Sequence, residues 1–154
     1  MGDTGFSSFN TTIQKTNKIL KEIEQAYGLS KERRNVSYAA LRSVLHALRD
    51  RLTVQETAHF AAQLPILVRG IYYHSWDPSE VPVKMHRDEF LQRVQQEFPF
   101  DAAGGIERLV TTVLHALRRY VAAGEWEIIK ANMPKDIVPL LQAATEPPSV
   151  QPTE

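Results

Sequence analysis

Cysteine is absent from the 154-residue sequence, and the two signs of charge balance, with 18 Lys and Arg residues against 18 Asp and Glu residues. The absence of cysteine excludes disulfide bonds, cysteine-ligated zinc sites, iron–sulfur clusters and thiol catalysis. Because the net charge is zero, charge gives no reason to expect a nucleic acid or an anionic membrane as the partner. A chain of this length can bury a sizeable core without a covalent or metal staple.

Long apolar runs and catalytic motifs are also absent. No run approaches the roughly 18 continuous apolar residues of a membrane span, and residues 1–10 lack the basic start and apolar stretch of a signal peptide. No serine lies in a G-x-S-x-G motif, and no glycine-rich phosphate loop follows a strand pattern. We therefore expect a cytoplasmic protein with no cofactor and no catalytic residue.

Helical periodicity is what the sequence does contain. In residues 41–52, apolar residues recur at the i, i+3, i+4 spacing that places them on one helical face. A second helical pattern covers residues 12–27 and is followed by Gly28, a plausible C-terminal stop. A third begins at residues 53–56, a Thr-x-x-Glu capping box, and ends at Pro65.

The helical pattern occurs twice along the chain. The sequence Leu-His-Ala-Leu-Arg at residues 45–49 recurs at residues 114–118, and matching apolar positions extend over three successive helices. Each half therefore predicts a three-helix unit that ends in Leu-Pro or Met-Pro, with a short helix after that proline as an option. Residues 66–73, which follow the first such proline, fit either a strand or a short helix.

A unit of about 60 residues buries little surface alone, which favours packing of the two copies on each other. We predict an all-α, compact bundle of about six main helices, built from two tandem three-helix repeats with pseudo-twofold symmetry. The alternative is two loosely coupled three-helix lobes. The expected boundaries are a flexible N-terminus at residues 1–11, a single duplicated domain at 12–143 (repeat one 12–74, linker 75–83, repeat two 84–143) and a disordered tail at 144–154.

Four segments occur in a characteristic order: Gln-Lys-Thr-Asn at residues 14–17, the helical pattern at residues 40–52, Ala-Ala-Gln-Leu-Pro at residues 61–65 and Arg-Gly-Ile-Tyr-Tyr at residues 69–73. Together they resemble the domain of unknown function 2267 family, and the similarity runs from about residue 12 to residue 141. The resemblance implies a small, all-helical, duplicated bacterial domain in the cytoplasm. It brings no established catalytic or binding residue with it.

The first candidate site is the aromatic stretch at the end of the first half. Its ring-bearing residues Tyr72, Tyr73, His74 and Trp76 precede a proline-containing loop, and the second half has no counterpart. Aromatic residues are favoured at binding surfaces because each contributes a large contact area with few rotors to freeze. Alternatively, the rings cap the end of the bundle and hold the linker to it.

The second candidate is a pair of equivalent His-x-x-Arg sets, His46 with Arg49 and His115 with Arg118. If the helices that carry them face each other across a twofold axis, the two sets could converge into an anion-binding or pH-sensitive site. Alternatively, each histidine flanks the core and faces water or a carboxylate.

The third candidate is a metal site at Glu56 and His59, which have the Glu-x-x-His spacing of di-iron helical bundles. Such bundles need a second motif of this kind, and the second half offers Glu125 but has Ile128 in place of the histidine. Glu56 is also accounted for by the capping box.

Taken together, these patterns predict a non-enzymatic module that binds a protein partner or a second copy of itself, with the aromatic stretch as the candidate surface. The alternative is a ligand- or metal-binding bundle that uses the histidines and Glu56 between the repeats. The basic cluster at residues 31–34 is typical of a solvated loop. We expect neither nucleic acid nor membrane as a partner, and a small-molecule ligand stays open.

Overall fold

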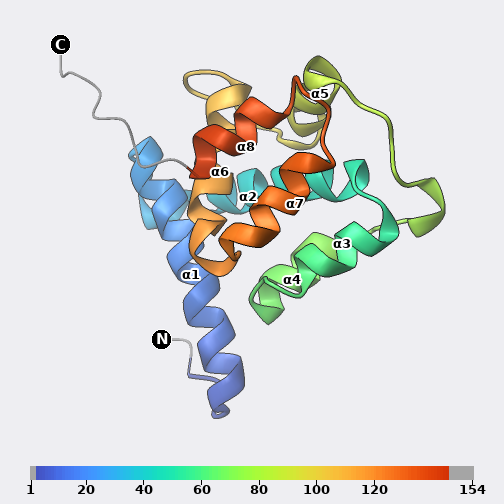
Figure 1. Ribbon diagram of the computed structural model, residues 1–154. Helices are drawn as coiled ribbons and strands as arrows, with labels where there is room; N and C mark the ends of the chain where they lie inside the picture. Colours follow the sequence, from blue (N-terminus) through green and yellow to red (C-terminus); the bar gives the residue numbers. More distant parts are fainter. Residues whose placement is uncertain (1–2, 146–154) are drawn as a thin grey trace.

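The computed structural model describes residues 3–145, and every regular element in that part of the chain is helical (Figure 1). The eight α-helices are α1 Ser7–Tyr27, α2 Arg34–Arg51, α3 Val54–Ala61, α4 Ile66–Tyr73, α5 Arg87–Glu97, α6 Ile106–Leu117, α7 Ala123–Ala131 and α8 Val138–Thr145. Short 3₁₀ turns are η1 Lys31–Arg33, η2 Pro78–Glu80 and η3 Arg118–Tyr120. None of the helices in this part has the length and apolar character to cross a membrane.

The all-α prediction is confirmed, and residues 3–145 form eight helices where about six main ones were expected, with a short helix after each proline as an option. The two additional helices, α4 and α8, follow Pro65 and Pro134, because proline ends one helix and the apolar residues after it start another. Residues 66–73, which fitted a strand or a short helix, form α4.

The helix ends follow the local sequence closely. Gly28 ends α1 in the left-handed conformation (φ 64°), and the Leu29 N–H donates to Glu24 O at 2.9 Å. Thr53 and Glu56 form the expected capping box of α3. The start of α1 is earlier than expected, because it begins at Ser7 and not at residue 12.

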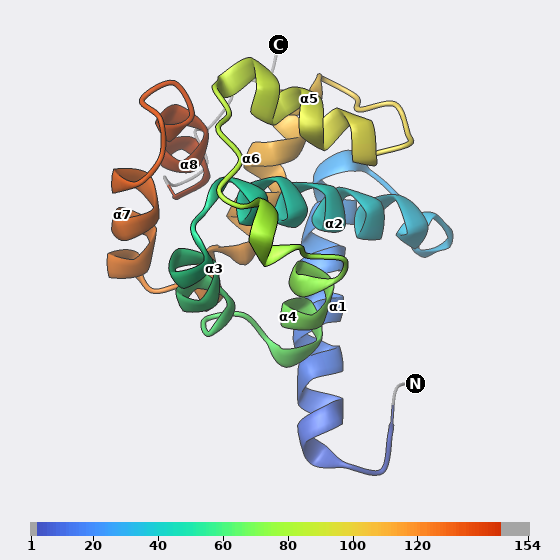
Figure 2. The ribbon, with the colours of Figure 1, turned by 90° about the vertical axis from the view of Figure 1, so that its right-hand side faces the viewer.

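α2 crosses the middle of the molecule (Figure 2) and lies against α1, α4, α5 and α6. Its apolar face is completely enclosed: Leu41, Val44 and Leu45 are 0% exposed. α6 lies against α1, α2, α5 and α8. One continuous core therefore includes residues from both halves, from Ile19 to Ala144, which does not agree with two loosely coupled lobes.

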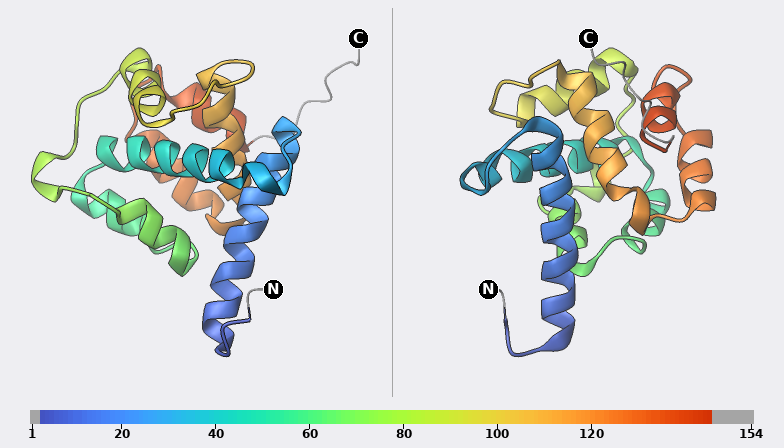
Figure 3. Two further views of the ribbon diagram at one scale, coloured as in Figure 1. Left: turned by 180° about the vertical axis from the view of Figure 1, so that it is seen from behind. Right: turned by 90° about the vertical axis from the view of Figure 1, so that its left-hand side faces the viewer.

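The first turns of α1 extend beyond the rest of the molecule (Figure 3). Its N-terminus is held by a local turn, in which Asn10 Oδ1 accepts from the Thr4 N–H at 2.7 Å. The flexible N-terminus predicted for residues 1–11 is therefore helical from Ser7 onward. At the other end, α8 includes residues 144–145, and the remainder of the predicted tail lies outside the described residues.

Candidate functional site

Tyr72 lies in the core and not at a surface. Its side chain is 0% exposed, and its ring lies 5.5 Å from the ring of Phe60 and 5.4 Å from that of Tyr73. Burial raises the pKa of the Tyr72 hydroxyl well above its ordinary value. The expectation that Tyr72 belongs to a partner-binding surface is therefore wrong, because α4 turns this residue inward.

The other rings of the stretch continue from Tyr72 toward the linker. Tyr73 and Trp76 are half-buried, with ring centroids 5.3 Å apart, and only His74 is exposed. Phe60, which contacts Tyr72, also contacts Trp126 of α7, with 5.8 Å between the two ring centroids. The arrangement agrees with the alternative interpretation, in which these rings close the end of the bundle and hold the linker.

His46 is buried between a carboxylate and a backbone carbonyl. Its Nδ1 lies 3.0 Å from Glu97 Oε1, and its Nε2 lies 2.8 Å from the carbonyl oxygen of Ile71. The two ring nitrogens thus each have a polar partner, one on α5 and one at the end of α4. The ring thus connects α2 to α5 and to the C-terminal end of α4.

Arg49 binds the same end of α4. Its Nη1 donates to the carbonyl oxygens of Tyr72 (3.0 Å) and His74 (2.7 Å), and its Nε donates to Asp50 (2.8 Å). The last carbonyls of a helix have no partner within the helix and carry partial negative charge, so a buried guanidinium is well placed there. Arg49 therefore acts as a side-chain cap of α4.

The sequence interpretation missed the partly exposed residues that complete this hydrogen-bond network. Glu97 also accepts from Arg42 at 3.1 Å, and Asp50 accepts from Arg93 at 3.0 Å. Burial raises the pKa of Glu97, but the contacts with His46 and Arg42 outweigh it and hold the pKa below its ordinary value. Glu97 and Arg93 lie on α5, about 50 residues from α2, so no local pattern marks them as partners.

His115 and Arg118 have partners of their own. His115 Nδ1 lies 2.9 Å from the carbonyl oxygen of Ala144, and Arg118 Nη1 donates to Glu22 at 2.8 Å. Within residues 3–145 the two His-x-x-Arg sets share no hydrogen-bond partner. The converging anion site stays a prediction that these contacts do not support.

Glu56 and His59 line a groove between α3 and α7, opposite Glu125. Glu56 Oε1 accepts from the Thr53 N–H at 2.9 Å, as expected for a capping box, and His59 is exposed. Within the described part of the chain, no group of three or more His, Asp and Glu side chains is placed to hold a metal ion. The metal site therefore stays a prediction.

The basic cluster at residues 31–34 was expected to be a solvated loop, but one of its residues, Arg34, forms a largely buried ion pair. Arg34 donates from Nε (2.9 Å) and Nη2 (3.1 Å) to the two oxygens of Glu24, which is 3% exposed. The Ser37 hydroxyl donates to the same carboxylate at 2.6 Å. Burial raises the pKa of the Glu24 carboxyl, but the hydrogen bonds from Arg34 and Ser37 outweigh burial. The pKa therefore lies below its ordinary value.

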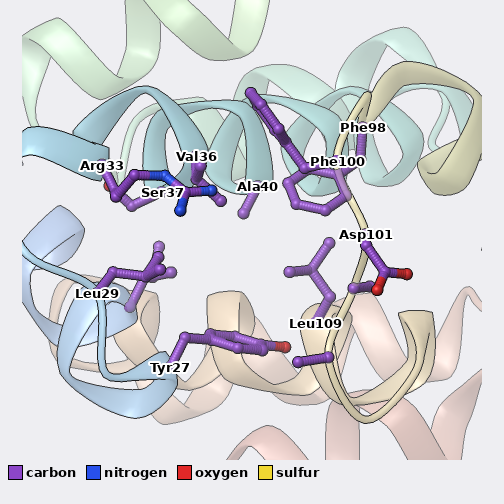
Figure 4. A pocket seen from close by; sticks show the side chains of 13 residues that line it. Tyr27, Leu29, Arg33, Val36, Ser37, Ala40, Phe98, Phe100, Asp101 and Leu109 are labelled. Carbon is purple, nitrogen blue, oxygen red and sulfur yellow. The ribbon is translucent and has the colours of Figure 1, made fainter.

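A cavity of about 200 Å³ lies beside this ion pair, between the end of α1, the start of α2 and the loop that precedes α6 (Figure 4). Its lining is mostly apolar. The residues that line it are Ile23, Tyr27, Leu29, Arg33, Val36, Ser37, Ala40, Phe98, Phe100, Asp101, Ala102, Ala103 and Leu109. Sequence reasoning missed this site because three segments, far apart along the chain, contribute to it.

Arg108 fixes the loop that forms one wall of the cavity. Its Nη2 donates to the carbonyl of Ala26 (2.7 Å), its Nη1 donates to that of Ala103 (3.0 Å), and its guanidinium lies 4.2 Å from the Tyr27 ring centroid. Gly104, at φ 80°, leaves room for this side chain, because a Cβ there would stand 2.8 Å from Arg108 Cδ. In the sequence, this loop contains the pair of glycines at residues 104–105.

The fold and these sites define a small all-α domain that has one continuous core and an apolar cavity at the junction of its two halves. The chain belongs to the family described as uncharacterized conserved protein, domain of unknown function 2267, which matches residues 16–140. This match confirms the resemblance found in the sequence. No curated protein matches the chain.

Proposed function

We propose that this chain is a duplicated helical domain that self-associates through an apolar surface at the projecting end of α1. The observation that carries the proposal is a pair of exposed phenylalanines, Phe6 and Phe9, which are 54% and 58% exposed. Their ring centroids lie 4.9 Å apart in an edge-to-face arrangement. Both lie at the end of α1 that projects from the rest of the described residues (Figure 3).

α4 carries a second pair of exposed apolar residues close to α1. Ile66 and Leu67 in its first turn are 63% and 42% exposed, and the Leu67 N–H donates to Thr12 Oγ1 at 2.8 Å, which joins α4 to α1. We call Phe6, Phe9, Ile66 and Leu67 the α1–α4 surface. Grouped exposed apolar residues, such as the two pairs of this surface, are typical of interaction sites, whereas single ones are ordinary.

A second copy of the chain is the occupant that fits this surface. A groove lies between the α1 part and the α4 part of this surface. It is lined mainly by hydroxyl and apolar side chains, and its charged residues are Lys15 and Arg69. Arg69 already donates to the carbonyls of Ala61 and Leu64. A charged partner would therefore find little to complement, whereas a twofold dimer requires only that the same surface meet itself.

Two ion pairs support the part of the proposal that describes the domain as two repeats of one helical unit. Asp50 of α2 accepts from Arg93 of α5 at 3.0 Å, and Arg119 of η3, directly after α6, donates to Glu22 of α1 at 3.0 Å. Position 50 corresponds to 119 under the shift that aligns α2 with α6, and position 22 corresponds to 93 under the shift that aligns α1 with α5. The same two positions are thus paired across the halves with reversed charges, as a pseudo-twofold arrangement predicts.

Sedimentation equilibrium of the untagged protein tests self-association. We expect a monomer–dimer equilibrium that Phe6→Ser with Phe9→Ser weakens by about a hundredfold, because two central aromatic anchors contribute roughly 1–2 kcal/mol each. The matched control is Val54→Ser with Ile128→Ser, two other exposed apolar residues, which should leave the equilibrium unchanged. A wild-type monomer, or equal weakening by both double variants, contradicts the proposal.

The alternative of a metal-dependent bundle has a separate test. If Glu56 and His59 hold a metal in the groove between α3 and α7, untagged protein contains a stoichiometric metal that His59→Ala removes. The proposal made here predicts metal-free protein by elemental analysis and no change in the helical circular dichroism spectrum with His59→Ala, since this residue is exposed.

A further inference from the structure

The cavity beside α1 and α2 is a preformed apolar chamber. Its volume of about 200 Å³ exceeds that of an engineered protein cavity of roughly 150 Å³ that binds benzene. Aromatic and aliphatic side chains form its walls: Ile23, Tyr27, Phe98, Phe100 and Leu109. A cavity of this volume with apolar walls suits a ligand whose apolar part is about as large as one aromatic ring.

The cavity lies where the two halves of the chain meet. Tyr27 corresponds to Phe98 under the shift that aligns α1 with α5, and Ala40 corresponds to Leu109 under the shift that aligns α2 with α6. All four residues line the cavity. Junctions between structural units are common places for small-ligand sites, because each unit contributes one wall.

The charges around the mouth favour an anionic ligand. Arg33 is exposed, its guanidinium has no hydrogen bond or ion pair within residues 3–145, and this group reaches over the cavity (Figure 4). Asp101 is the acidic residue of the lining, and its carboxylate points away from the cavity in the same view. The nearby carboxylate of Glu24 is already bound to Arg34 and Ser37.

We propose that this cavity binds a small carboxylic acid with an apolar, ring-sized body, and that Arg33 pairs with its carboxylate. A guanidinium presents two parallel N–H donors that match the two oxygens of a carboxylate. The contacts of Arg108 with Ala26 and Ala103 hold the wall in place before the ligand arrives, which lowers the ordering cost of binding. The site is separate from the α1–α4 surface, so either proposal can fail alone.

Nuclear magnetic resonance titration with three matched probes tests the site: phenylpropanoate, the neutral phenylpropanol and the cationic phenylpropylamine. We expect saturable methyl shifts at Ile23, Leu29 and Leu109 with phenylpropanoate, an affinity roughly tenfold lower for the alcohol, and the weakest binding for the amine. Arg33→Gln should lower the affinity for phenylpropanoate about tenfold and leave that for the alcohol unchanged.

Lys31→Gln is the matched control, because it removes the same charge from the same 3₁₀ turn without touching the cavity. It should leave the affinity for phenylpropanoate nearly unchanged. Equal affinities for acid and alcohol, an equal loss in both variants, or shifts confined to Ile66 and Leu67 would each overturn the proposal.

Discussion

At the scale of single residues, the molecule depends on buried charges that the sequence does not distinguish from solvated ones. Glu24 and Glu22 belong to the same charged stretch of α1, yet Glu22 stays partly exposed, whereas Glu24 is 3% exposed and accepts from Arg34 and Ser37. Which of the two carboxylates is buried depends on where α2 packs against α1, and this packing is determined by the tertiary structure and not by the local sequence. A buried carboxylate that is bound this way is costly to alter, because removing the charge leaves its guanidinium without a partner.

We expect Glu24→Gln to lower the free energy of unfolding by about 3 kcal/mol at neutral pH. Because the folded pKa of Glu24 is lowered from 4.5, its stabilisation is complete above that pH and is lost as the pH falls through the folded pKa. Urea unfolding at a series of pH values should therefore show the difference between wild type and variant shrinking below pH 4.5. The exposed Glu127→Gln is the control, with an effect under about 0.5 kcal/mol at every pH; a pH-independent difference for Glu24→Gln contradicts this explanation.

At the scale of helices, the sequence predicted most of what the structure contains, because the signals are local. The glycine after α1, the capping box of α3 and the proline after it all have the expected positions. The aromatic stretch was harder, since the same residues suit a surface or a core. Its helix, α4, turns Tyr72 inward only because α2 and α3 lie there to receive it.

The two capping positions offer a paired prediction. Thr53 caps α3, whereas the N-cap position of α7 is Ala122, whose backbone is extended but whose side chain has no oxygen. Thr53→Ala should destabilise the protein by about 1 kcal/mol, and Ala122→Ser, which restores a Ser-x-x-Glu box with Glu125, should stabilise it by roughly 0.5–1 kcal/mol. Thermal unfolding measured by circular dichroism checks both, and destabilisation by Ala122→Ser would refute the capping argument.

At the scale of the whole molecule, the candidate sites come from segments that only the fold brings together. The cavity combines the end of α1, the start of α2 and the loop before α6, and the α1–α4 surface combines the N-terminal parts of two helices that are joined by Thr12 and Leu67, 55 residues apart. The repeat in the sequence predicted a shared core, but not which residues it would leave at its junctions or at its edge.

The most direct test of self-association uses the absence of cysteine from the chain. Single cysteines replace Ser8, which is exposed in the first turns of α1, or Asp88, which is exposed at the start of α5. Each purified variant is then treated with a short bifunctional maleimide. The account predicts a covalent dimer for Ser8→Cys that disappears when Phe6 and Phe9 are changed to serine, and none for Asp88→Cys. Monomer alone with Ser8→Cys, or equal cross-linking at both positions, would contradict it.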